Sequence, residues 1–147
     1  MGKKRWTYGL VALFFASAFW SSAQEESRTD IPRVEARLST DSIWIGDQFT
    51  LEVVVEKDMM QVIDFPTFQN DEGKIGTIGD KVEVLLEYPV DTLERDGRSV
   101  KIRKRYLLTA FDAGHYNLGR FSALSLDKNV VDTLYPPDSL RFHVQTF

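Results

Sequence analysis

The sequence predicts an all-β protein: an immunoglobulin-like β-sandwich of about seven to eight antiparallel strands, preceded by a signal peptide. Apolar and polar residues alternate with a period of two along most of the chain after residue 31. Clusters of Gly, Pro, Asp and Asn separate these runs, and no stretch after residue 24 has the 3.6-residue period of an amphipathic helix. Short strands at this spacing are typical of a sandwich built on one core.

Residues 1–23 have the three parts of a secretory signal peptide. Lys3, Lys4 and Arg5 form a positive head, an uncharged apolar run covers residues 9–20, and small residues lead up to Ala23. A run of about a dozen residues is short for a membrane span, which needs about 20. We therefore predict cleavage after Ala23 and export to the periplasm or cell envelope; the alternative is an uncleaved membrane anchor.

The chain that follows is acidic and has no cysteine. Residues 24–147 contain 15 basic and 22 acidic side chains, a net charge of −7. This balance argues against nucleic acid and anionic lipid head groups as partners, and predicts no membrane insertion after cleavage. Without cysteine, thiol chemistry and Cys-type metal sites are excluded. Residues 24–31 are polar and predict a flexible leader, and residues 32–147 are enough for one domain.

The first strands are predicted from their alternation. Residues 33–38 place apolar side chains at every second position, and from Ile43 to Val55 the odd positions are almost all apolar. Gly46 and Asp47 interrupt the second run as a bend or bulge. One face of each strand should therefore be buried.

The remaining strands are separated by turn residues. Pro66 predicts an extended connection and residues 70–80, with three glycines, predict a loop. Two long strands are expected at 82–93 and 100–111, joined by a hairpin at the Asp-Gly pair of residues 96–97. Four short strands should follow, at residues 116–118, 121–126, 130–135 and 140–146.

A structural corner is predicted where the second long strand ends. Asp112, Gly114 and Tyr116 stand at offsets that allow a tyrosine hydroxyl to turn back onto nearby backbone, as in immunoglobulin-like sandwiches. Gly114 would supply a positive φ. The alternative is an ordinary turn followed by a half-buried tyrosine.

Four stretches together resemble the periplasmic part of BatD-type proteins, the oxygen tolerance (aerotolerance) family. They are Ala-Arg-Leu at 36–38, Ile-Gly-Asp-Gln-Phe-Thr-Leu at 45–51, Phe-Pro-Thr-Phe at 65–68 and Tyr-Leu-Leu-Thr-Ala-Phe-Asp-Ala-Gly-His-Tyr at 106–116. The resemblance implies an immunoglobulin-like envelope module, commonly followed by a membrane helix. Since residues 24–147 contain no second apolar segment, we expect the N-terminal module of a longer protein; the alternative is a soluble relative with a single module.

No catalytic, metal-binding or cofactor-binding pattern stands out. His115 and His143 lack ligand spacing and are interpreted as surface or turn histidines. The basic run at 101–105 is interpreted as a charged strand face, with cross-strand partners expected at Glu83, Glu87 and Asp91. The sequence therefore predicts a protein that is not an enzyme and has no cofactor.

Exposed aromatic residues give the functional hypothesis. Trp44 has the opposite parity to Ile43 and Ile45, so it should point away from the core and mark a contact surface; the alternative is that it packs under the neighbouring loop or a second module. Phe65 and Phe68 could extend the same patch. We predict a non-enzymatic interaction or scaffolding module of the cell envelope, binding an envelope protein or further domains of its own chain. The alternative is a carbohydrate-binding sandwich, which needs two or three coplanar exposed rings.

Overall fold

The computed structural model describes residues 32–69, 72–74, 76–127 and 129–147. The predicted signal peptide and leader lie outside these residues. All regular structure in the described part is strand. The strands are β1 (Arg33–Leu38), β2 (Ser42–Trp44), β3 (Gln48–Asp58), β4 (Val62–Asp64), β5 (Thr77–Ile78), β6 (Val82–Glu87), β7 (Asp91–Asp96), β8 (Ser99–Ala110), β9 (Gly114–Gly119), β10 (Ala123–Asp127), β11 (Val130–Leu134) and β12 (Leu140–Gln145).

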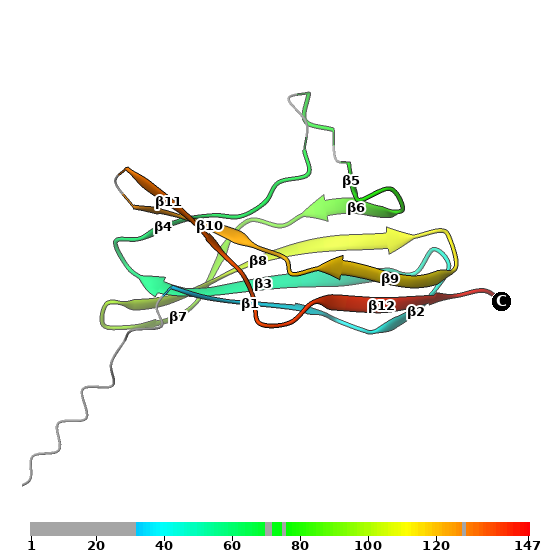
Figure 1. Cartoon of the computed structure of the whole chain (residues 1–147), viewed down its shortest axis with the longest axis horizontal. Coiled ribbons are helices and arrows are strands. Elements are labelled where there is room, and N and C mark those ends of the chain that lie inside the picture. Colours follow the sequence, from blue (N-terminus) through cyan, green and yellow to red (C-terminus); the bar gives the residue numbers. More distant parts are fainter. Residues whose placement is uncertain (1–31, 70–71, 75, 128) are drawn as a thin grey trace, which may run out of the picture.

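The strands form a sandwich of one large sheet against two small ones (Figure 1). The large sheet has the order β1-β3-β8-β6-β5, and β7 also pairs with β8. The small sheets have the orders β11-β10-β4 and β2-β12-β9. All pairs are antiparallel except β2 with β12, which is parallel. The predicted all-β sandwich is confirmed.

The core lies where the large sheet faces the small ones. In β3 the odd positions are buried, among them Leu51, Val53 and Val55 at 0% exposure, and in β8 the even positions from Tyr106 to Ala110 are buried. Phe49 of β3 packs on Phe142 of β12, with ring centroids 4.7 Å apart. Each such side chain stabilises the fold by roughly 1.5–3 kcal/mol. The predicted parity of the second strand run is correct.

The structure contains more strands than predicted for two reasons. One predicted long strand is divided into two, and short segments form strands by pairing with residues far away in the sequence. The predicted strand at 82–93 is two strands, β6 and β7, which pair with successive parts of β8. Between them stands Pro89, which has no amide hydrogen to donate. β5 falls in the segment predicted as a loop. β4, which precedes the predicted connection and was not predicted as a strand, pairs with the distant β10.

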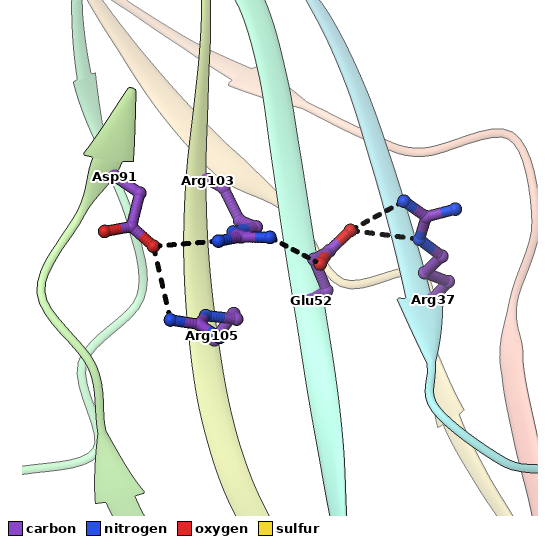
Figure 2. Close-up of polar contacts among 5 residues, drawn as sticks. All are labelled: Arg37, Glu52, Asp91, Arg103 and Arg105. Atoms are coloured by element: carbon purple, nitrogen blue, oxygen red, sulfur yellow. Dashed lines mark hydrogen bonds and ion pairs between the residues drawn. The ribbon is translucent and has the colours of Figure 1, made fainter. Parts of the chain in front are cut away.

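The outer face of the large sheet carries a connected set of charges (Figure 2). Glu52 of β3 accepts from Arg37 of β1 at 2.8 and 3.0 Å and pairs with Arg103 of β8 at 3.5 Å. Asp91 of β7 then accepts from Arg103 at 3.1 Å and from Arg105 at 3.3 Å. The expected pairing of Asp91 with the basic run is therefore confirmed.

The other two expected partners of the basic run behave differently. Glu87 accepts from the Thr67 hydroxyl and from the backbone N–H of Phe68, both at 3.1 Å. Glu83 makes no ion pair with the described residues. Glu87 thus binds the connection that follows β4. It does not form the expected ion pair with a basic residue of β8.

Tyr106 joins this connection to the core. Its ring is fully buried and lies edge-on to Phe68 and Phe121, with centroids 5.5 and 5.7 Å away. Its hydroxyl donates to the carbonyl oxygen of Pro66 at 2.5 Å. One side chain of β8 therefore binds the extended segment that precedes the 70–80 loop.

Candidate functional site

The outward face of the β2-β12-β9 sheet gathers the residues best suited to bind a ligand. β12 buries Leu140, Phe142 and Val144, so the residues between them point outward. The register places β2 and β9 residues beside them on the same face. We call this surface the Trp44 face; it comprises Ser42, Trp44, His115, Asn117, Arg141, His143 and Gln145.

Trp44 lies at one end of this face, and its backbone is fixed by a turn. Its side chain is 43% exposed, and its ring stacks on Phe147 with centroids 5.2 Å apart and planes 10° apart. Its backbone N–H donates to the Asp47 carboxylate at 3.0 Å, and the Asp47 N–H donates back to the Trp44 carbonyl at 3.0 Å. The outward direction predicted from the parity of Trp44 is what the structure shows.

A third exposed aromatic residue lies beside the same turn. Phe111 follows β8, and a Cβ placed on Gly46 would be 3.5 Å from its ring. Gly46 has a φ of +83° and donates its N–H to the carbonyl of Ala110. A side chain at position 46 would therefore be strained. The parity of β8 predicts an outward Phe111, since the even positions of the strand are buried, but the sequence analysis did not single this residue out.

Phe65 and Phe68 do not extend this surface, and that prediction is wrong. Phe65 belongs to the core at 9% exposure, and Phe68 packs between Tyr106 and Phe121. The strands β4 and β2 also lie toward opposite ends of the sandwich (Figure 1). The two phenylalanines stand on either side of Pro66 and anchor this extended segment to the core. They do not form a surface for a partner.

The two histidines of the chain meet on the Trp44 face. His115 of β9 is the register partner of His143 of β12, and their rings stack with centroids 4.2 Å apart. A hollow beside them is lined by Asp41, Asn117 and Arg141. The prediction of surface histidines gave no hint of this pairing, since the register of β9 against β12 cannot be read from the sequence.

This face offers hydrogen-bonding groups beside an aromatic surface. Imidazole, guanidinium and amide groups lie in neighbouring rows, and Gln145 donates to the Ser42 hydroxyl at 2.7 Å. In the ranges that the structure describes, no group of three or more His, Cys, Asp or Glu side chains could hold a metal ion. The arrangement suits recognition through stacking and hydrogen bonds.

The three residues of the predicted corner lie together at the start of β9. The Tyr116 hydroxyl donates to the carbonyl oxygen of Asp112 at 2.6 Å, and Gly114 has a φ of +143°. The Tyr116 ring stacks on Phe142 with centroids 4.8 Å apart. Partial burial, with a smaller effect of the Asp112 charge, raises the pKa of Tyr116. The corner therefore links the start of β9 to the core below the Trp44 face.

Substitutions at this corner should lower stability modestly. Tyr116→Phe is expected to cost about 0.5–1 kcal/mol, because the tyrosine is only half-buried and water can replace the lost bond. Gly114→Val should cost about 1 kcal/mol or more through backbone strain alone, because no atom lies within 4 Å of the added Cβ. Urea unfolding measures both. Two unchanged midpoints would show that the corner does not contribute to stability.

Comparisons with known proteins give a structural likeness and no family. No family model matches the sequence, and no curated protein matches it. The structure is similar to a cohesin module from a family 33 glycoside hydrolase of Clostridium perfringens, with 13% identity and a TM-score of 0.38 over 79% of this chain and 99% of that module. In the described ranges, no helix has the length and apolar character needed to span a membrane.

Proposed function

We propose that this chain is a non-enzymatic interaction module of the cell envelope that binds a protein partner through the Trp44 face. The observation that carries the proposal is the exposed Trp44 indole, which stacks on Phe147, on a turn whose backbone is bound by the Asp47 carboxylate. Tryptophan is enriched among the residues that dominate binding energy at interfaces.

The proposed location follows from the N-terminal pattern. A positive head, a short apolar run and small residues before position 24 support export. The resemblance to BatD-type proteins supports a partner within the envelope, either another protein or further domains of the same chain. The hydrogen-bonding groups around His115 and His143 would give such contacts their specificity.

The geometry favours a protein over a glycan as the ligand. A sugar platform needs aromatic rings side by side in one plane. The rings of Trp44 and Phe147 instead lie one on top of the other, with an angle of 10° between their planes. They therefore form one stack and not two neighbouring rings in a common plane. This surface suits insertion into a pocket of a partner, as interface aromatic residues do.

Trp44→Ala should weaken binding of the partner by about 2 kcal/mol, or roughly thirtyfold. The partner is first captured from envelope extract with the wild-type chain and identified, and its affinity for each variant is then titrated. Leu86→Ala is the matched control, because Leu86 is also 43% exposed but belongs to the large sheet. Both variants should unfold at the urea midpoint of the wild type.

Two results would contradict this proposal. Retention of the wild type on a polysaccharide affinity gel, with no protein recovered from the extract, would assign the module to glycan binding. Equal affinity of wild type and Trp44→Ala for an identified partner would show that the Trp44 face is not the contact surface.

A further inference from the structure

A second surface, independent of the Trp44 face, lies on the β11-β10-β4 sheet. Register pairs Leu126 of β10 with Val62 of β4 on one side and with Val131 of β11 on the other. These three side chains therefore form one row across the sheet. Val62 is 57% exposed, Leu126 is 36% exposed and Val131 is 62% exposed. A contiguous exposed apolar row of this kind marks a contact surface more often than scattered apolar residues do.

The opposite face of this sheet shows why the row is left outside. Ile63 packs against the core and Ser125 is 5% exposed, so at β4 and β10 this face covers the core. Asp132, the register partner of Ser125 on β11, is exposed, so the same face is open to solvent at the β11 edge. The period of two then turns the neighbouring positions outward. Apolar residues in the outward positions of all three strands thus do not contribute to the folding core.

The row ends at a strand edge that is open to pairing. β11 is the last strand of its sheet, and among the described residues no strand pairs with its second edge. Its sequence from Val130 to Leu134 contains no proline or lysine, and its pairing with β10 has no bulge. Natural edge strands commonly use those features to prevent the addition of another strand. An edge without them can accept an extended segment through its free backbone groups.

The carboxylates near this edge are exposed. Asp132 on β11 and Asp127 at the end of β10 form no ion pair with the described residues. The carboxylates of Glu52 and Asp91 on the large sheet are each bound by arginines. The small sheet therefore complements a partner that brings cations.

We propose that the β11 edge binds an extended polypeptide segment in which apolar residues alternate with lysine or arginine. The apolar side chains of the segment would continue the row that ends at Val131. The basic side chains, on the other parity, would lie beside Asp132, where opposite charges on neighbouring strands are favourable. The binding site combines backbone pairing, apolar burial and charge.

A second copy of this chain fits the same edge less well. Antiparallel pairing of two β11 strands centred on Asp132 would place two carboxylates opposite each other, which is destabilising. Pairing centred on Val131 would place each Asp132 opposite an apolar Val130 and leave its charge uncompensated. A foreign basic strand meets neither difficulty.

The test uses fluorescent peptides and charge-reversed variants of the whole chain. The probes are a short peptide of alternating valine and lysine, the same peptide with glutamate for lysine, and a valine–lysine peptide with a central proline. Asp132→Lys reverses the charge beside the edge. Asp80→Lys is the matched control, because Asp80 is also exposed and forms no ion pair within the described ranges, but lies in the turn between β5 and β6.

The valine–lysine peptide should bind the wild type at least about tenfold more tightly than the glutamate peptide. Asp132→Lys should reverse this preference, Asp80→Lys should keep it, and the central proline should weaken binding. Failure of the valine–lysine peptide to bind, or equal binding of all peptides, would overturn the proposal. Concentration-dependent dimerisation that Val131→Lys abolishes would assign the edge to a second copy and overturn it too.

Discussion

Tyr106→Phe is expected to lower the free energy of unfolding by about 1–3 kcal/mol at neutral pH. The substitution keeps the ring against Phe68 and Phe121 but removes the donor that Pro66 accepts from. The Tyr106 side chain is fully buried, so water cannot easily replace the bond. The cost therefore includes the desolvation of an unpaired carbonyl group.

The same tyrosine should make the protein sensitive to alkali. Burial, with smaller contributions from the Glu87 and Asp64 charges, raises the pKa of Tyr106 above its ordinary value of 10.0. Above pH 10 the unfolded chain loses this proton while the folded chain keeps it, so the folded state binds more protons and stability falls as pH rises. This contribution is fully present below pH 10. Tyr106→Phe should therefore lose less stability than the wild type between neutral pH and pH values above 10.

Urea unfolding at neutral pH and at two pH values above 10 measures both effects. Tyr135→Phe is the control, because Tyr135 is 56% exposed and its hydroxyl forms no hydrogen bond within the described part of the chain. This variant should match the wild type at neutral pH. A Tyr106→Phe variant that is as stable as the wild type at neutral pH would show that the bond to Pro66 does not hold the segment.

Asp91→Asn should have the second large effect, about 1–2 kcal/mol of lost stability at low salt. Asp91 binds both Arg103 and Arg105 (Figure 2). The Nε atoms of these arginines are buried and have no hydrogen-bond partner among the described residues. Removing the carboxylate leaves two guanidinium groups on one strand face with their charges less compensated. Hydrogen bonds to charged groups contribute more than neutral ones, but Asp91 is 40% exposed, so solvent reduces the effect.

Ionic strength separates this effect from a packing defect. Salt screens charges near a surface, so the difference between Asp91→Asn and wild type should shrink as salt is added. Asp96→Asn is the matched control, since Asp96 belongs to the same strand, is exposed and forms no ion pair with the described residues. A loss of stability that is equal at low and high salt would show that charge is not the cause.

The parts of the fold that could be predicted are those fixed by local alternation. β1, β3 and β8 alternate over six to twelve residues, so their buried faces follow from the sequence. β4 and β5 are three and two residues long and exist through pairing with other segments, which alternation over so short a length cannot show. The division of the 82–93 run could have been predicted, because Pro89 has no amide hydrogen to donate within a strand.

The candidate site divides in the same way. The outward direction of Trp44 follows from its parity, because its neighbours Ile43 and Ile45 face the core. The pairing of His115 with His143 depends on how β9 is registered against β12, a non-local property. The prediction for Phe65 and Phe68 is wrong, because an apolar residue in an extended segment can face either a partner or the core, and here both pack in or against the core.

The parallel pairing of β2 with β12 has a mechanical consequence. β1 begins toward one end of the sandwich and β12 runs toward the other, where the C-terminus lies (Figure 1). Tension between the start of β1 and the C-terminus pulls β2 and β12 in opposite directions along their axes. It therefore loads the hydrogen bonds between these strands in shear, and the bonds from Ile45 to Gln145 and from His143 to Asp41 are loaded with them. Bonds loaded this way share the force and break together, whereas a pull across the strands would open them one by one. The domain should therefore resist stretching along its length far better than peeling from its side.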